Sequence, residues 1–565
     1  MRKLSLLFLA LVACVLASKA QEISYNILHE ADTTVKAKIS GMSFGSRNVR
    51  YYVYEYPSKN GFGKVITASG IIMAPMNIVD GSVPCDGVIM FNHHTIGSPE
   101  DAPSAGGLDV PSGILANPLK PNYIVVMADY MGYGSSSSEM VEYLCGDTNA
   151  RNSLDGLLAA RKLFEDKKIP QGKYLFNMGY SQGGVESMYA AKLCDMEERY
   201  KGIRFTKTFV GGGPLDMEAA YSAYVKKDQC DAINDVAIFL ISVNEKCRLG
   251  IKYSDLFKGK LGQDENVLRF LREKRKSVLG ELGVSDLDSL HQLLQPAYMD
   301  LKSEPAQALL NALKEIKVSN GWTPDSTQQY YIEHSRHDNY VPVKCSHDMI
   351  TWMKAKGFKA SLVPGKTNLQ TNMLVFKLKH QQAGIVWAIQ TLAATQFWPV
   401  VYHENEQNRY YHNFVKDLNL MKVVKLLESW GLDLRKLASQ APSIQAEMAA
   451  AIAEGSMDPE GSVRQLVGSR RANILEQILG VLAKLDLTLT DAIEMLDDSG
   501  ITTDDIMELV NYFSGSTAAP ANVDLLTTLE DKTEAPLYLL RLYEQTLANC
   551  FLLAGHDVDY SSWGW

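Results

Sequence analysis

The sequence predicts an α/β fold in which a mostly parallel sheet is covered by helices on both faces. From Arg50 to about Ile203, short runs typical of buried strands alternate with segments of helical periodicity. Helical periodicity then dominates from Leu215 to about Asp325, and strand signals return only after this block. We therefore expect a helical insertion between two parts of one sheet, placed as a cap over it.

The first part of the sheet is predicted from runs rich in apolar, aromatic and β-branched residues. Two of these runs, 87–91 and 123–127, are continuously apolar, as is typical of strands buried on both faces. The expected elements in chain order are strands at 51–54, 68–73, 87–91 and 123–127, a helix at 152–164, a strand at 173–178, a helix at 181–193 and a strand at 206–210.

The later elements divide the chain further. In the insertion, helical periodicity is clearest at 236–243, 267–279 and 287–294, and strands are expected at 329–332 and 359–363. After about Trp398 the pattern is helical to the end of the chain. The predicted parts are a signal peptide at 1–20, the first part of the core at 21–214, a helical cap at 215–327, the second part of the core at 328–400 and a helical C-terminal region at 401–565.

The N-terminal segment is typical of a secretory signal. Two basic residues precede an apolar stretch, Leu4 to Ala17, which is shorter than the roughly 20 residues that a membrane-spanning helix needs. Small residues favour cleavage after Ala20. Leu11-Val12-Ala13-Cys14 also matches a lipobox, so a lipoprotein anchored through Cys14 is an alternative to free secretion. Both predict a chain that is secreted or periplasmic.

Composition and charge exclude several classes of partner. The chain is 46% hydrophobic and 21% charged, which is typical of a globular protein. A net charge of −9 argues against nucleic acid or an anionic membrane as a partner. The cysteines show neither a disulfide framework nor the spacing of a zinc site, and the closest couple, Cys230 and Cys247, is not shown to be linked. We predict no metal and no cofactor.

Two segments match Gly-x-Ser-x-Gly, the pattern around the nucleophile of α/β-hydrolases, and only one has the right surroundings. That nucleophile needs a strand, a sharp turn and then a helix. Ser181 follows the predicted strand 173–178 and precedes a helical run, whereas Ser43 leads into an alternating, strand-like segment. We predict that Ser181 is the nucleophile, that the small Gly179 and Gly183 leave room for its turn, and that Ser43 is a turn residue.

A serine nucleophile needs a base, and the base needs a carboxylate that orients it. In this fold class the order along the chain is serine, acid, histidine, at the ends of late strands. Asp338 lies just past a strand at 330–334, whereas Asp325 precedes that strand and Asp348 lies on the next helix. His380 follows the strand 359–363 and a loop, and precedes a helix. Asp338 and His380 are the predicted acid and base.

The donors that stabilise an oxyanion are expected from the backbone after the nucleophile and after an earlier strand. These positions are Gln182 and Thr95. His93 and His94 are adjacent in a loop, and neighbouring residues without a third ligand at recognisable spacing are not expected to hold a metal. The pocket is predicted to include His94, Tyr130 and Tyr180.

With these residues assigned, the chain resembles the secretory-type lipase/esterase family of α/β-hydrolases over roughly residues 50–400. The resemblance implies Ser181, Asp338 and His380 as the catalytic triad, in agreement with the positions derived above. The family commonly has His-Gly where this chain has His93-His94, so the second histidine is expected to narrow the acyl pocket. The motifs that carry the resemblance are His93-His94-Thr95, Asp129-Tyr130-Met131-Gly132, Gly179 to Gly184, Gly212-Gly213-Pro214, Asp338 with Val341-Pro342, and His380.

The resemblance implies a secreted carboxylic-ester hydrolase that acts through an acyl-enzyme on Ser181. The expected substrate is a small-molecule, lipid or acylated-carbohydrate ester. Two alternatives stay open: a serine peptidase or aminopeptidase of the same fold, and a catalytically silent binding protein. The region 401–565 lies outside the resemblance, and it either completes the core or serves as an interaction module.

Overall fold

The computed structural model describes residues 23–397, except 40–41, 108, 117–121, 229–231, 285–288, 362–367 and 375–377. The predicted signal peptide and the predicted C-terminal region 401–565 lie outside these residues. The chain divides into two compact units, Met1–Asp325 and Ser326–Trp565. The finer predicted boundaries, at 214/215, 327/328 and 400/401, stay predictions.

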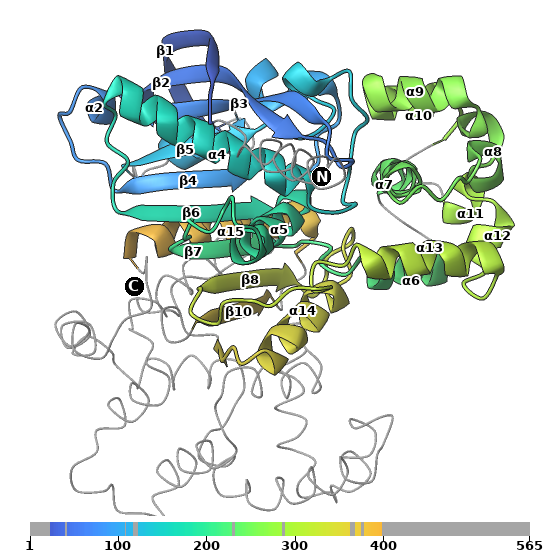
Figure 1. Ribbon diagram of the computed structural model, residues 1–565. Coiled ribbons are helices and arrows are strands. Elements are labelled where there is room, and N and C mark those ends of the chain that lie inside the picture. The colour runs from blue at the N-terminus through green and yellow to red at the C-terminus, as the bar shows by residue number, and fades with distance from the viewer. Residues whose placement is uncertain are drawn as a thin grey trace, which may run out of the picture. The chain divides into compact units, whose positions relative to one another are not determined.

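Strands β1 to β7 belong to the first unit and lie in the order β1-β2-β3-β5-β4-β6-β7 (Figure 1). The first three strands and β5 pair antiparallel in that order, whereas β5, β4, β6 and β7 pair parallel. All the strands predicted in this unit are confirmed, and the long β1 was not predicted. The strands are β1 (Asn26–Ile39), β2 (Met42–Lys59), β3 (Val65–Pro75), β4 (Gly87–Asn92), β5 (Tyr123–Ala128), β6 (Tyr174–Tyr180) and β7 (Lys207–Gly211).

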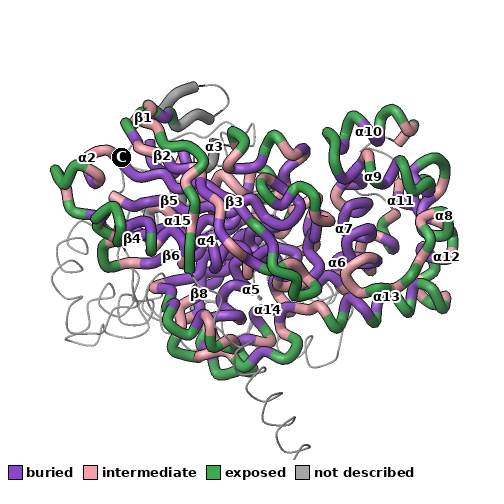
Figure 2. Tube along the Cα trace, turned by 45° about the horizontal axis from the view of Figure 1, so that its top comes forward, coloured by how far each residue is buried: buried purple, intermediate pink, exposed green. Residues whose placement is uncertain are grey.

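The centre of this sheet is buried, as its apolar runs predict. Every residue of β4 and of β5 is buried (Figure 2). Helix α4 (Thr148–Lys167) packs against β2 and β5, and α5 (Gln182–Met196) packs against β6 and β7. Both correspond to predicted helices. The predicted fold class, α/β with a mostly parallel central sheet, is confirmed.

Among the described residues, helices alone lie between β7 and β8. Figure 1 shows α7 to α13 gathered beyond the sheet of the first unit, on the side toward which β4 and β6 point. These helices are α6 (Met217–Lys227), α7 (Ile233–Lys246), α8 (Tyr253–Leu256), α9 (Asp264–Arg272), α10 (Arg275–Glu281), α11 (Leu290–Leu293), α12 (Pro296–Met299) and α13 (Glu304–Glu315), with a 3₁₀ turn at Gly259–Gly262.

The single helix predicted at 267–279 is wrong, because two extended residues, Glu273 and Lys274, separate α9 from α10. The break turns Arg275 toward the core, where its backbone N–H donates to the Gly97 carbonyl at 3.1 Å. The Arg275 side chain is fully buried and its Nη1 donates to the Tyr133 hydroxyl at 3.0 Å. Tertiary contacts thus overrule the local periodicity at this point.

The second unit contains parallel strands in the order β8-β10-β9. The predicted strands at 329–332 and 359–363 correspond to β8 and to the two-residue β9. Strand β10, which lies between them, falls where the sequence predicted a loop, because its buried Gln370 and Thr371 hide its strand character. The elements are β8 (Tyr330–Ser335), α14 (Lys344–Ala355), β9 (Ala360–Ser361), β10 (Leu369–Leu374) and α15 (His380–Phe397).

The described residues also bear on membranes, metals and disulfides. In this part of the chain no helix combines the length and the apolar character needed to cross a bilayer. Nor do three His, Cys, Asp or Glu side chains within it converge on a point where a metal ion would fit. Cys230, like Cys14 and Cys550, lies outside the described residues. The cysteines that the structure does describe, all of them free, are Cys85, Cys145, Cys194, Cys247 and Cys345.

Candidate active site

Ser181 occupies a strained turn between a buried strand and a helix. It follows β6 directly, it is the N-cap of α5, and its backbone angles are φ 57° and ψ −122°. A residue other than glycine rarely adopts a positive φ, which costs on the order of 1–3 kcal/mol and persists only where the surroundings enforce it. The enforcing bonds include Ser181 N–H to the Gly211 carbonyl, 2.8 Å, and Gly184 N–H to the Ser181 carbonyl, 3.0 Å. The predicted strand, turn and helix are therefore present around Ser181.

The two glycines of the motif have no room for a side chain. A Cβ atom on Gly179 would lie 2.0 Å from the Gly183 carbonyl oxygen, and one on Gly183 would lie 2.0 Å from the Asn92 carbonyl oxygen. Both obstacles are backbone atoms, which cannot rotate away. The small residues thus let β6, β4 and the start of α5 approach one another closely enough to hold the turn.

The variant Gly183→Ala is expected to lose about 1–3 kcal/mol of stability or more, because the added methyl group forces the start of α5 away from the end of β4. The melting temperature and the rate of ester hydrolysis should fall together. Gly202→Ala is the matched control, since a Cβ atom there meets nothing within 4 Å. A Gly183→Ala protein with unchanged melting temperature and activity would contradict this account of the turn.

The second Gly-x-Ser-x-Gly segment has a different setting. Ser43 belongs to β2 and is opposite Lys38 of β1, next to the connection between these antiparallel strands. The prediction that Ser43 is a turn residue is wrong by a small margin, since the residue is part of the strand. A strand on both sides of the connection leaves no helix for a nucleophile turn.

The two predicted oxyanion donors lie at the same edge of the sheet. Strands β4 and β6 are parallel neighbours, with Asn92 opposite Gly179, so the loop that carries Thr95 leaves the sheet beside the turn at Ser181. Gln182 is the first residue of α5, and the first N–H groups of a helix have no partner within the helix. The Thr95 hydroxyl is hydrogen-bonded to the Tyr143 hydroxyl at 2.7 Å.

The predicted pocket residues His94, Tyr130 and Tyr180 differ in burial and in contacts. The Tyr130 ring is buried and stacks on the His93 ring with centroids 3.8 Å apart, and its hydroxyl donates to the His93 carbonyl. Burial lowers the pKa of His93 to about 4, so this imidazole is neutral near pH 7. His94 is exposed, and Tyr180 is half-buried with its ring against Gly212. Tyr130 therefore packs against the loop that carries His93 and Thr95 and does not itself lie at the surface.

Asp338 and His380, both in the second unit, form a hydrogen-bonded acid–base pair. Asp338 Oδ2 accepts from His380 Nδ1 at 2.6 Å, and Asp338 Oδ1 accepts from the backbone N–H groups of Tyr340 and Val341, each at 2.8 Å. His380 begins α15, and the Tyr340 ring stacks on its imidazole. The bond at Nδ1 makes Nε2 the nitrogen that can take up a proton.

The carboxyl of Asp338 is held in its ionised form. Burial raises its pKa, but hydrogen bonds from His334 and His380 outweigh that effect and hold the pKa well below the usual range for aspartate. A buried carboxylate with several N–H donors is the form that orients and stabilises a histidinium. The sequence predicted no part for His334 in holding the carboxyl.

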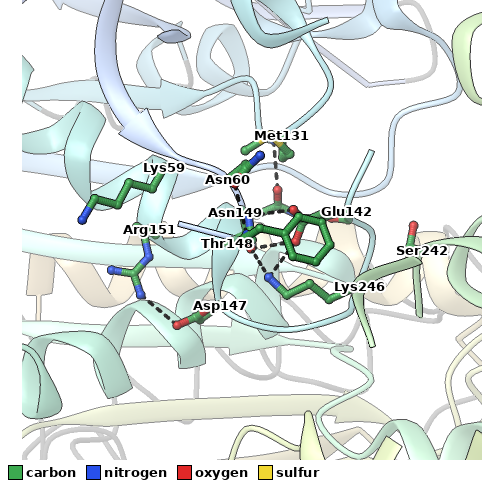
Figure 3. Close-up of polar contacts among 12 residues, drawn as sticks. Lys59, Asn60, Met131, Glu142, Asp147, Thr148, Asn149, Arg151, Ser242 and Lys246 are labelled. Carbon is green, nitrogen blue, oxygen red and sulfur yellow. Dashed lines mark hydrogen bonds and ion pairs between the residues drawn. The ribbon is translucent and has the colours of Figure 1, made fainter. Parts of the chain in front are cut away.

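A buried polar network behind the turn also escaped the sequence analysis. Figure 3 shows Lys246, at the end of α7, paired with Glu142 at 2.9 Å and donating to Thr148. Asn149 accepts from the backbone of Met131 and donates to the Glu142 carbonyl (Figure 3). The Asn149 amide also donates to Glu186 of α5 at 3.1 Å. One chain of polar contacts therefore runs from the helical insertion to the helix that follows Ser181.

Glu186 is a fully buried carboxyl on α5, one helical turn after Gln182, whose side chain hydrogen-bonds to it. Burial raises the pKa of Glu186 to about 8, and hydrogen bonds lower it only in part. The signal available in the sequence was a single glutamate within the run Gly183 to Leu193, whose other residues are small, apolar or uncharged, apart from Lys192 near the helix end.

This buried carboxyl gives the stability a defined dependence on pH. Between the ordinary value of 4.5 and about 8, the unfolded chain releases a proton that folded Glu186 keeps, so its contribution to stability falls as the pH rises. The loss amounts to at most about 1.4 kcal/mol per pH unit. Between pH 5 and pH 8, the melting temperature of Glu186→Gln is expected to fall less than the melting temperature of the wild type. The control Glu198→Gln, at an exposed residue, should keep the wild-type slope, and an equal slope in all three proteins would contradict the prediction.

The strand order and the strained serine between strand and helix define a protein of the α/β-hydrolase class. Residues 108–202, which include Ser181, match the family model described as secretory lipase. This match agrees with the resemblance to secretory-type lipases that the motifs predicted.

Solved structures agree with this fold. A Legionella pneumophila protein described as a hydrolase is 18% identical, with a TM-score of 0.54 over 67% of this chain and 98% of that one. The rice cell wall degrading esterase LipA of Xanthomonas oryzae, in a ligand-bound form, is 19% identical, with a TM-score of 0.51 over 65% of this chain and 96% of that one. No curated protein matches the sequence.

Proposed function

We propose that this protein is a secreted serine esterase in which Ser181, His380 and Asp338 act as a catalytic triad. The observation that carries the proposal is the strained backbone of Ser181, because strain at one position is maintained only where the surrounding structure is built to hold it. The hydrogen-bonded pair of Asp338 and His380 supplies the base and its orienting acid. Both fit the chemistry of the secretory lipase family.

In the proposed reaction, the Ser181 hydroxyl attacks the carbonyl carbon of an ester while His380 Nε2 accepts its proton. Asp338 stabilises the histidinium that forms. The backbone N–H groups of Gln182 and Thr95 bind the oxyanion of the tetrahedral intermediate. The histidinium then returns its proton to the leaving alcohol, and the acyl group stays on Ser181. Water, deprotonated by the same imidazole, attacks the acyl carbon and releases the carboxylic acid.

The experiment that tests this function compares the hydrolysis of ester bonds and amide bonds by one purified protein. Initial rates are measured with 4-nitrophenyl esters of increasing acyl chain length, with acylated carbohydrates, and with aminoacyl 4-nitroanilides. Ester hydrolysis that exceeds amide hydrolysis, together with covalent labelling of Ser181 by a fluorophosphonate, is the expected result. Preferred cleavage of the anilides would establish a peptidase instead, and failure to label would establish a silent binding protein.

Secretion is part of the proposal and rests on the N-terminal segment and on the family match. Mass spectrometry of the mature protein tests it directly. An N-terminus at Gln21 is expected, whereas a diacylglyceryl group on Cys14 would establish the lipoprotein alternative.

A further inference from the structure

A second histidine lies against the carboxyl group of Asp338. His334, in β8, is fully buried, and its Nε2 lies 3.4 Å from Asp338 Oδ2, the oxygen that His380 also contacts. The same Nε2 is 3.0 Å from the Val341 carbonyl oxygen. Asp338 Oδ2 thus faces two imidazoles, while Oδ1 is held by two backbone N–H groups.

The partners of His334 determine which nitrogen carries a proton. A carbonyl oxygen only accepts hydrogen bonds, so Nε2 must carry a hydrogen in order to bond to Val341. The other nitrogen, Nδ1, is 2.7 Å from the Ser346 hydroxyl of α14, which donates to a neutral ring and accepts from a charged one. In both states the Nε2–H group points at Val341 and Asp338. His334 therefore presents a donor to the carboxylate whatever its own charge.

We propose that His334 is a positioning residue for the reaction. Its Nε2–H keeps the Asp338 carboxylate ionised and turned toward His380, and Ser346 fixes the orientation of the His334 ring. This inference rests on the proposed triad, in which Asp338 orients the base. Without His334, Oδ1 would keep its two backbone donors, but Oδ2 would be held by His380 alone. Its charge would then act more fully on the His380 imidazole, and the orientation of both groups would be less well defined.

Of the ionisable side chains near Asp338, His334 and His380 are the two that interact with its carboxylate. They are the two side chains whose hydrogen bonds and charges hold the pKa of Asp338 down against burial. Strand β10 carries no ionisable side chain. Helix α14, which packs on β8, carries Lys344, Cys345, His347, Asp348 and Lys354.

The test is the pH profile of kcat/KM for His334→Phe, which keeps an aromatic ring but removes both hydrogen bonds. We expect kcat to fall about 10- to 100-fold with KM nearly unchanged, since a hydrogen bond to a charged group is lost. We also expect the acidic limb of the profile to shift to higher pH. Without the His334 donor, Asp338 Oδ2 holds the histidinium more tightly, so a higher pH is needed to free the base.

Two further variants separate positioning from mere packing. His334→Gln returns an N–H donor and should bring the acidic limb back toward that of the wild type. Ser346→Ala keeps His334 but removes the hydrogen bond that orients its ring. It should shift the acidic limb to higher pH, as His334→Phe does, but by less. As a matched control, His291→Phe removes a histidine that is also paired with an aspartate, Asp228, but on the exposed surface of the insertion. This control should behave as the wild type.

The outcomes distinguish this inference from the proposed function. If wild-type protein hydrolyses esters and labels at Ser181, but His334→Phe keeps the wild-type profile, the role of His334 is wrong and the triad stands. A parallel loss at every pH, not recovered in His334→Gln, also overturns the role. If His334→Phe does not fold, the profiles of His334→Gln and Ser346→Ala decide. If the wild type neither hydrolyses esters nor labels, the proposed function itself fails.

Discussion

Replacing Ser181 by alanine is expected to lower kcat for ester hydrolysis by up to about 10⁶-fold. The hydroxyl oxygen is the atom that forms the acyl-enzyme, and no neighbouring group in the proposed mechanism replaces it. Alanine has nearly the same size and the same backbone restriction at φ 57°, so the melting temperature should change little. The measurement is the rate of hydrolysis of a 4-nitrophenyl ester by purified protein, with fluorophosphonate labelling as a second readout.

Ser43→Ala is the matched control for this experiment, because Ser43 has the same Gly-x-Ser-x-Gly surroundings in sequence but lies in β2. It should keep full activity and full labelling. Undiminished hydrolysis by Ser181→Ala, or loss of activity in Ser43→Ala without loss of fold, would falsify the assignment of the nucleophile. A residual rate above that of water is expected in Ser181→Ala, since bound ester still meets the oxyanion donors.

Asp338→Asn is expected to lower turnover by roughly 10⁴-fold. The amide is nearly the same size as the carboxyl but lacks its negative charge, and its NH₂ group cannot accept the hydrogen of His380 Nδ1. If the amide turns its NH₂ toward Nδ1, the imidazole takes the other tautomer, with its hydrogen on Nε2, where the proton of Ser181 must be received. Activity is measured as kcat/KM from pH 5 to pH 10, because both steps of the proposed reaction need the deprotonated imidazole of His380.

Asp348→Asn tests the specificity of that effect. Asp348 lies on α14, where it pairs with Lys344 at the surface, and it was the alternative acid closest in sequence. Its loss should leave hydrolysis unchanged. Near-normal activity in Asp338→Asn together with a large loss in Asp348→Asn would transfer the acid role and undo the proposed triad.

Much of the fold was predictable because the central strands β4 and β5 are buried along their whole length. The runs at 87–91 and 123–127 are apolar without interruption, and such runs leave little choice but a central strand. Strand β10 was missed because Gln370 and Thr371 face the interior with polar side chains, and the local pattern contains no sign of the strands that flank it. The break between α9 and α10 was missed because Arg275 is hydrogen-bonded to Gly97 and Tyr133, which are far away in the sequence.

The candidate site divides in the same way. The strand, turn and helix around Ser181 were predictable, because they depend on neighbouring residues and on two small glycines in the turn. The contacts of His334, Asn149 and Glu186 were not predictable, because each depends on a partner that the fold brings close. His334 lies four residues before Asp338, but on a strand that ends between them, and only the turn at Asp338 brings the ring and the carboxyl together.

The long hairpin arm formed by β1 and β2 bears on how the outer edge of this sheet avoids pairing with other chains. Strand β1 is the outer strand of the sheet in the first unit, and an uncovered outer strand can recruit other chains and start aggregation. Here Glu30, Asp32 and Lys36 occupy that strand, and Arg50 of β2 is bonded to Asp32 across the pair. A second chain that paired along this edge would remove water from these charged side chains, which makes such pairing unfavourable. The one strand of this unit that the sequence did not predict thus carries charges that oppose pairing at the edge of the sheet.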